Sequence, residues 1–460
     1  MKRKFGFGGW HGLTAKRAGR VGHAHHSLAA ARPCHPIPRA STYVVLGVVA
    51  LFGVGGLNCP PDPGEPPIYN NTSDPTNNGA TYLTSTACSA CHPDYAAIHN
   101  LHAHAHKLTP VTDGSPSFPA EATTAGVPNP PNGFAWSDIA YLIGGYAKRA
   151  LFVDRDGYIL TTGLTGQATQ WNLTFPPNGT TASFGIYDPG AVAPKPYDFE
   201  AFRHDTTGPV PQDPAQPMFQ DNRPGILGTW SEPGVMCESC HGPGSKHIPN
   251  PGARNIFVDL TGAQTCNQCH SRPYGSTTGE IPGAGGFIQD LCQNLELRAS
   301  GGHSSFDCAF CHDPHYSLTY DRPNAIRNEC TACHTDANMA LHSGKVFRRG
   351  DYEEPLTCMS CHMPFATLTG SQATPAVVGT RGRMGDTRTH IFRISTDSID
   401  YNSFFTAGGT KVALDAEGRA AVTVDFVCLR CHNEVTTPTL AFTVERAAEI
   451  AKGLHLPFGN

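Results

Sequence analysis

One five-residue pattern, Cys-x-x-Cys-His, occurs seven times in this chain of 460 residues. Five copies lie within the 126 residues from 237 to 362, and one further copy lies on each side of that stretch. The cysteine pairs are Cys88 and Cys91, Cys237 and Cys240, Cys266 and Cys269, Cys308 and Cys311, Cys330 and Cys333, Cys358 and Cys361, and Cys428 and Cys431. The histidines that follow them are His92, His241, His270, His312, His334, His362 and His432.

This spacing suits covalent attachment of a porphyrin. Residues i, i+3 and i+4 share one face of a helical turn, so two thiols meet the porphyrin edge while the imidazole reaches the iron. Structural zinc is the alternative, because Cys-x-x-Cys pairs are also half-sites of zinc ribbons. Histidine is 23 of the 460 residues, and its presence after all seven pairs by chance has odds on the order of one in a billion. The sequence therefore predicts seven covalent c-type haems.

The remaining histidines could supply second ligands to the irons. Outside the first 58 residues there are eleven, enough for every sixth position. An iron between two histidines is closed and suited to moving electrons, whereas substrate chemistry needs an open position. Four of the eleven crowd the stretch after the first motif: His99, His102, His104 and His106. Because residues i, i+2 and i+4 cannot all face the same way, at most one or two of them can serve.

Residues 1–58 have the composition of an export leader. They carry eight Lys or Arg and no Asp or Glu, and they end in a fifteen-residue apolar run at 43–57. That run is shorter than the ~20 residues that span a bilayer, which is typical of a secretory signal. We expect the protein to act outside the cytoplasm, in the periplasm, at the outer membrane or at the cell surface.

Cys59 follows the apolar run directly and opens a Pro- and Asn-rich tether at 59–81. A lipid-anchored lipoprotein has this build, although Gly56 stands where a lipoprotein signal usually has Leu. Lipidation of Cys59, plain cleavage and a retained 43–57 anchor all stay open. Cys292 is the one cysteine outside both the haem motifs and the first 59 residues, and we expect it to be a buried small hydrophobe.

The charge balance argues against a nucleic-acid partner. Without the eight basic residues of the leader, 25 Lys and Arg face 38 Asp and Glu, so the net charge is near −13. Nucleic-acid binding needs a basic stripe.

We expect residues 82–460 to form a seven-haem domain, with an N-terminal part at 82–275 and a C-terminal haem cluster at 276–460. Gly and Pro together number 88, below the ~25–30% of a disordered low-complexity chain. The expected fold class is mainly irregular, templated by haem, with short α-helices at the motifs, a few β-hairpins and little continuous sheet. Hairpins are predicted at 150–161 and 411–426, around Gly157 and Gly418, and an amphipathic helix at 443–452.

Beyond the motifs the chain resembles the multihaem c-type cytochromes, nearest the tetrahaem cytochrome of ammonia oxidisers and the octahaem tetrathionate- and hydroxylamine-converting enzymes. The stretches that carry the resemblance lie at 104–108, 141–146, 228–247, 311–315 and 389–394.

The resemblance implies distal ligands at His315 and His390, followed by His104, His247, His303 and His342, with His102 as the substitute for His104. Because His315 and His247 are too close in sequence to His312 and His241 to cap the same irons, each should serve a neighbouring haem. His204 is a weaker candidate, and His99, His106 and His455 are expected to be surface histidines. Relatives often carry a further haem motif where this chain reads Glu200 to Gly208 without cysteine, so an eighth haem is expected to be lost.

Two functions stay open. The first is an electron carrier of respiratory or extracellular electron transfer, working between redox donor and acceptor proteins, with self-assembly into a haem polymer allowed. The second is a reductase or oxidase of a small nitrogen or sulfur compound such as nitrite, hydroxylamine or tetrathionate, with one open haem. No motif has Lys in place of its final His, the mark of a catalytic haem in nitrite reductases, so the carrier is favoured and no catalytic residue is assigned.

Overall fold

The computed structural model describes residues 75–253, 255–272, 279–337, 339–369 and 377–455. These residues belong to one compact unit, Gly64–Asn460. The leader, the apolar run at 43–57, Cys59 and most of the tether lie outside the described residues. Within the described ranges, no helix is both long enough and apolar enough to cross a membrane.

The helices are short, and each haem motif contains or directly follows one of them. The α-helices are α1 (Ser85–Ser89), α2 (Pro93–His99), α3 (Thr162–Thr165), α4 (Phe199–Phe202), α5 (Cys237–His241), α6 (Gln293–Arg298), α7 (Cys308–Cys311), α8 (Arg322–Ala325), α9 (Cys358–His362), α10 (Val424–Val427) and α11 (Val444–Gly453). The 3-10 helices are η1 (Ala103–His106), η2 (Trp136–Asp138), η3 (Pro176–Asn178), η4 (Gln220–Asn222), η5 (Pro251–Ala253), η6 (Cys266–Gln268), η7 (Gly301–His303), η8 (Cys330–Ala332), η9 (Ala340–His342), η10 (Tyr401–Phe404) and η11 (Pro438–Leu440). This agrees with the expected short helices at the motifs.

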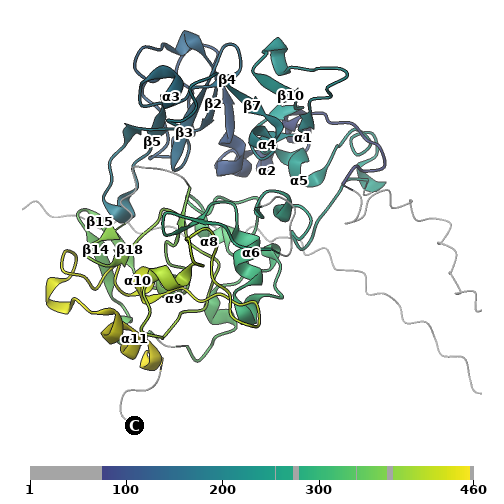
Figure 1. Ribbon diagram of the computed structural model, residues 1–460. Coiled ribbons are helices and arrows are strands. Elements are labelled where there is room, and N and C mark those ends of the chain that lie inside the picture. The colour runs from purple at the N-terminus through teal and green to yellow at the C-terminus, as the bar shows by residue number, and fades with distance from the viewer. Residues whose placement is uncertain (1–74, 254, 273–278, 338, 370–376, 456–460) are drawn as a thin grey trace, which may run out of the picture. The chain divides into compact units, whose positions relative to one another are not determined.

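A nine-stranded sheet fills the long interval between the first and second motifs. Its strands are β1 (Leu108–Pro110), β2 (Ile139–Gly144), β3 (Arg149–Asp154), β4 (Tyr158–Ile159), β5 (Gln170–Asn172), β6 (Ser183–Gly185), β7 (Lys195–Asp198), β9 (Val210–Pro211) and β10 (Ile226–Thr229). The order is β1-β2-β3-β4-β7-β10-β9, and β5 joins β3 to β6. β2 and β3 pair antiparallel with Leu142 opposite Phe152, while β7 and β10 run parallel. Figure 1 shows β2, β3, β4, β5 and β7 grouped together.

The hairpin predicted at 150–161 is confirmed as the β3–β4 pair. Val153 lies opposite Ile159, and Gly157 adopts a φ of 91° in the turn, a conformation that favours glycine. The expectation of little continuous sheet is wrong for this region. Strands far apart in sequence, such as β4 and β7, pair here, and their apolar residues form two buried clusters around Phe152 and Tyr197.

The remaining strands form small sheets. They are β8 (Thr206–Thr207) with β11 (Glu232–Pro233), β12 (Gly283–Ala284) with β13 (Phe287–Gln289) and β16 (Thr367–Leu368), β14 (Val346–Arg349) with β15 (Tyr352–Pro355), and β17 (Val377–Val378) with β18 (Gly382–Arg383).

The hairpin predicted at 411–426 is wrong. A tight turn does form, in which Asp415 and Arg419 are bonded through their backbones at 2.8 Å. The two arms, however, pair elsewhere: Val412 bridges to Phe405, and Val422 runs parallel to Ile394. Each arm completes its backbone hydrogen bonds with a segment that packs in the same core, and this competes successfully with local pairing.

A third core, built from residues between 281 and 427, supports the C-terminal motifs. Cys292 is fully buried in it beside Phe287 and Phe426, as expected for a small hydrophobe. Cys361 and Cys428 pack against the same cluster.

The predicted C-terminal helix is confirmed as α11, whose N-cap, Thr443, accepts a hydrogen bond from the backbone N–H of Arg446. In Figure 1, α9, α10 and α11 lie close together in the yellow-green part of the chain. The boundary expected at residue 275 stays a prediction.

Candidate haem sites

Every motif histidine lies one helical turn after the first cysteine of its motif. In five motifs its backbone N–H donates to the carbonyl of that cysteine at 2.8 to 3.0 Å. The other two motifs are themselves the helices α5 and α9. The thiols and the imidazole of each motif therefore share one face, as the spacing predicts.

Each motif histidine also faces a second histidine from another part of the chain. The ring centroids of these pairs are 5.8 to 6.4 Å apart. The pairs are His92 with His247, His241 with His315, His270 with His104, His312 with His390, His334 with His303, His362 with His455, and His432 with His342. Seven motifs thus bring together seven pairs among the described residues.

The spacing of these pairs fits a metal ion between the rings. An imidazole nitrogen binds a metal at about 2 Å, so two rings on one ion place their centroids roughly 6 Å apart. By contrast, His106 stacks directly on Tyr146 with centroids 4.5 Å apart. Two thiols and two imidazoles are the protein groups that a covalently attached haem with closed coordination requires. The residues present therefore fit c-type haem.

Burial keeps His270, His312 and His390 in the form that binds a metal. It lowers the pKa of His390 to about 3 and also lowers the pKa of His270 and His312. Desolvation penalises the charged imidazolium, so these rings are neutral at physiological pH. A neutral ring has a lone pair to give to iron.

Hydrogen bonds orient several motif histidines through Nδ1. The Nδ1 atoms of His241, His362 and His432 lie 3.0, 2.8 and 3.1 Å from the backbone carbonyls of Phe257, Phe392 and Leu440. That of His270 lies 3.0 Å from Oε1 of Gln293. A carbonyl partner on Nδ1 fixes the tautomer and leaves Nε2 for a metal.

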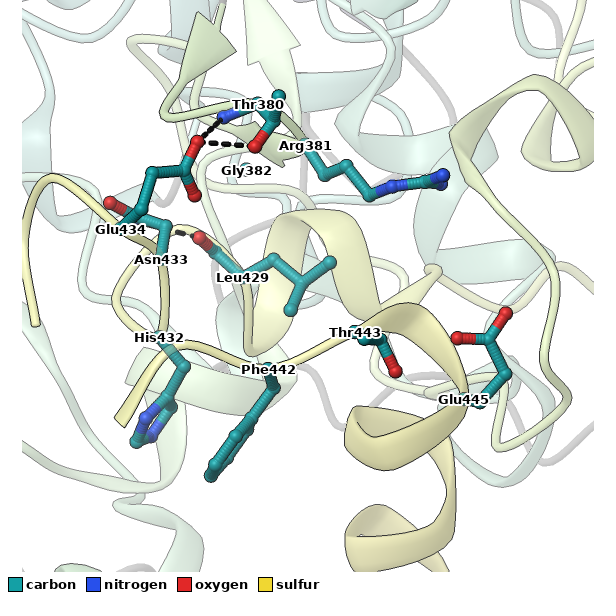
Figure 2. A pocket seen from close by; sticks show the side chains of 10 residues that line it. All are labelled: Thr380, Arg381, Gly382, Leu429, His432, Asn433, Glu434, Phe442, Thr443 and Glu445. Atoms are coloured by element: carbon teal, nitrogen blue, oxygen red, sulfur yellow. Dashed lines mark hydrogen bonds between the residues drawn. The ribbon is translucent and has the colours of Figure 1, made fainter. Parts of the chain in front are cut away.

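The surroundings of His432 are drawn in Figure 2. Its ring stacks on Phe442, with centroids 4.4 Å apart and the planes at 11°. The pair borders a pocket whose other lining residues are Thr380, Arg381, Gly382, Leu429, Asn433, Glu434, Thr443 and Glu445. Glu434 accepts hydrogen bonds from the backbone and hydroxyl of Thr380. These contacts fix the loop that carries the seventh motif.

A buried carboxyl group positions His390. Oε2 of Glu296, on α6, accepts hydrogen bonds from the hydroxyl of Thr389 at 2.8 Å and from the backbone N–H of His390 at 2.6 Å. Burial raises the pKa of Glu296 to about 7. Sequence reasoning missed this residue, because nothing local links α6 to a segment more than ninety positions away.

Motifs that are consecutive in the sequence are also neighbours in space. The thiol of Cys88 lies close to that of Cys237, and the thiol of Cys266 lies close to that of Cys308. Electrostatic interactions link further pairs, namely Cys240 with Cys269, Cys311 with Cys330, Cys330 with Cys358, and Cys361 with Cys428. Each motif therefore lies beside the next along the whole series.

The six histidines expected to be distal ligands all face motif histidines. As expected, His315 and His247 face motifs other than the adjacent ones. His104 rather than His102 faces His270, and Nδ1 of His102 accepts the backbone N–H of His104. Whether these rings bind iron stays a prediction, and so does the role of His204, whose pKa burial lowers.

His455 is exposed, as expected of a surface histidine. Its ring nevertheless lies opposite His362 at 5.8 Å and 15°, which the sequence did not predict. No motif lies near His455 in the sequence, so its position after α11 could not be linked to His362 in advance.

The motifs, the paired histidines and the fold define the class: the chain is similar to the multihaem c-type cytochromes, which confirms the resemblance seen in the sequence. One curated relative is the dissimilatory sulfite reductase MccA of Wolinella succinogenes, 24% identical over an alignment of 273 residues that covers 49% of this chain. The match spans 35% of that relative's length. No protein-family model matches the sequence.

One solved structure has a related fold, and a second is more distantly similar. Form II of the octaheme sulfite reductase MccA from Wolinella succinogenes matches with a TM-score of 0.51 and 16% identity, over 84% of this chain and 73% of that one. The outer cell wall cytochrome OcwA gives a TM-score of 0.46 and 16% identity, over 80% of this chain and 86% of that one. The likeness to MccA shows a shared fold.

Proposed function

We propose that this protein is an exported electron carrier that holds seven covalent c-type haems, each between two histidines. Haem supplies one-electron redox chemistry when bound. The observation that carries the proposal is the pairing of all seven motif histidines with second histidines in the described chain.

The paired rings would exclude substrate. If each haem were held by a motif histidine and its paired histidine, a small oxyanion would have no open position there, and the haem would supply electron transfer alone. The rings are held by protein contacts, such as the Nδ1 bonds of His362 and His432. Rigid ligands favour electron transfer because little has to rearrange when the charge changes.

The neighbouring motifs would supply the path. Covalent attachment at thiols that approach one another, such as Cys88 with Cys237 and Cys266 with Cys308, fixes successive sites side by side. Gly262 helps one such approach. It has a φ of 75°, and a Cβ there would meet Sγ of Cys266 at 2.9 Å. The sequence order of the motifs would then be the order of the sites.

The alternative is a reductase of a small sulfur or nitrogen compound, and the name of the curated relative, a sulfite reductase, favours it. It would require one open iron. The sixth motif is the place to look, since its partner His455 is exposed and stands at the end of the described chain.

The leader and the tether support export and an envelope or cell-surface location, with attachment through a lipid on Cys59 or through the 43–57 segment. Redox donor and acceptor proteins are the proposed partners. Assembly of copies into a longer haem polymer is compatible with this role.

Gas binding and turnover distinguish the two functions. The reduced, haem-loaded protein is exposed to carbon monoxide, and sulfite, nitrite, hydroxylamine and tetrathionate are offered with a viologen donor. A carrier with closed irons gives no carbon monoxide shift and no turnover, yet exchanges electrons with the viologen. A shift in about one haem of seven together with turnover of any of these compounds contradicts the proposal.

A further inference from the structure

Buried charges of opposite sign stand at the two ends of the motif series. At the N-terminal end, Glu238 lies inside the second motif and is only 2% exposed. Its carboxylate accepts hydrogen bonds from the backbone N–H groups of Leu83, Thr84 and Gly244, at 2.8 to 3.1 Å. Glu238 therefore links the second motif to the segment that leads into the first motif.

A second carboxylate stands beside it. Oε2 of Glu232 accepts hydrogen bonds from the backbone and hydroxyl of Ser85, at 2.9 and 2.8 Å. Both glutamates interact electrostatically with the Cys88 thiol. Their hydrogen-bond partners here are neutral, so two negative charges remain next to the first two motifs.

At the C-terminal end the corresponding charge is positive. Arg430 lies inside the seventh motif, is 1% exposed, and interacts electrostatically with Cys361 of the sixth motif and Cys431 of the seventh. It thus lies where these two motifs meet. Its Nη2 donates to the carbonyl of Ser360 at 3.2 Å, and its Nε is buried without a hydrogen-bond partner among the described residues.

Two further guanidinium groups surround Arg430. Nη2 of Arg349 donates to the Arg430 carbonyl at 3.3 Å. Arg388 pairs with Glu354 at 2.7 Å, and Glu354 is also 3.4 Å from Arg430. Arg388 and Arg430 share the Glu354 carboxylate, and Arg349 lies beside them, so these four side chains carry a net charge of +2. Arginine stays protonated at any working pH, so this charge is permanent.

Charge near an iron shifts its reduction potential. Reduction adds an electron, which positive charge stabilises and negative charge destabilises, and a buried position weakens the solvent screening. Counted over the side chains named here, the charges at the two ends differ by four units, −2 beside the first two motifs and +2 beside the last two. Asp425 interacts with the Cys428 thiol and offsets part of the positive charge at the seventh motif when it is ionised.

We infer that Glu232 and Glu238 lower the reduction potentials of the sites at motifs 1 and 2, while the Arg430 cluster raises those at motifs 6 and 7, so that electrons run downhill from the N-terminal to the C-terminal motifs. The inference rests on the proposed function. A low-potential redox protein loses one electron at the first site, and a higher-potential acceptor gains one at the last. No atom or proton changes place.

The test is a spectroelectrochemical titration of the full haem-loaded chain. Arg430→Met removes the central charge and keeps an apolar stem of similar length. It should lower the highest midpoint potentials by at least about 59 mV, which is a tenfold change in the equilibrium constant of a one-electron reduction. Arg430→Lys keeps the charge and should retain most of the wild-type value. Glu238→Gln, nearly isosteric, should raise the lowest midpoint potentials.

Arg446→Met, on the exposed face of α11 and paired with Glu449, is the matched control and should leave the titration unchanged. The inference is overturned if Arg430→Met and Glu238→Gln both titrate like wild type, or if Arg430→Lys shifts the curve as far as Arg430→Met. Haem count and low-spin signals of each variant are recorded first. If wild type itself lacks seven low-spin haems, the proposed function fails; if it has them and the variants titrate alike, only the gradient fails.

Discussion

The rings of His362 and His455 lie 5.8 Å apart, centroid to centroid, with their planes at 15°. His362 belongs to the sixth haem motif, and His455 follows α11 near the end of the described chain. The segment that follows the C-terminal helix thus places the His455 ring beside a motif histidine more than ninety residues earlier in the chain.

His455→Ala should open one site. Without the second imidazole, the iron at motif 6 has no sixth protein ligand in this geometry, so about one haem in seven should turn high-spin and bind carbon monoxide. The measurement is electron paramagnetic resonance of the oxidised variant.

The control for that variant is His106→Ala. The His106 ring stacks on Tyr146 and faces no motif histidine in the described pairs, so this substitution should leave the spin state unchanged. Equal effects of the two substitutions, or a fully low-spin spectrum from His455→Ala, would argue against the ligand role.

Asp425 should make stability depend on pH. Burial raises the pKa of this carboxyl group, on α10, to about 6, from an ordinary value of 3.8. The folded chain therefore holds the proton more tightly than the unfolded chain. The stabilisation is complete below about pH 4 and is lost as the pH rises through 6, by on the order of 3 kcal/mol at most.

Asp425→Asn removes this titration. Urea unfolding of the haem-loaded protein at pH 4.5 and pH 7.5 should show a smaller loss of stability for the variant than for wild type. Glu449→Gln, at an exposed position on α11, serves as the control. Wild-type and Asp425→Asn curves that fall in parallel would show that Asp425 does not titrate in this range.

Phe426→Ala should destabilise the C-terminal core. The ring is completely buried and packs edge-on against Phe287 and Phe404. Removing it leaves a cavity, with an expected loss of about 3–5 kcal/mol. Leu414→Ala, at a position 41% exposed, should cost less than about 1 kcal/mol in the same denaturant experiment. A comparable loss from both variants would place Phe426 outside the cooperative core.

Cys292 should resist thiol reagents in the folded protein. It is fully buried, and burial raises its pKa to about 12, so almost no thiolate exists near neutral pH. Peptide mapping after treatment with an alkylating reagent should find Cys292 unmodified in native protein and modified after denaturation. Rapid native labelling would contradict its placement in the core.

The sequence predicts the parts of this molecule that depend on contacts between residues close together in the chain. A motif histidine is four residues from the first cysteine and directly follows the second, so their common face follows from helix geometry alone. The β3–β4 hairpin and α11 are similarly local, with Gly157 in the turn of the first and Thr443 capping the second.

The features that the sequence did not predict depend on pairing between segments far apart in the chain. The arms around Gly418 have strand-like sequences, but their partners at Phe405 and Ile394 are set by core packing. The nine-stranded sheet arises in the same way, from pairs such as β4 with β7. The contact between Arg430 and Glu354 also joins distant segments, and so does the approach of His455 to His362.

The most direct measurement combines haem counting by intact mass with electron paramagnetic resonance of the oxidised protein. We predict seven haems per chain, all low-spin, because every motif histidine faces a second histidine. Fewer than seven haems, or a high-spin signal from one iron in seven in the unmodified protein, would contradict the closed electron carrier.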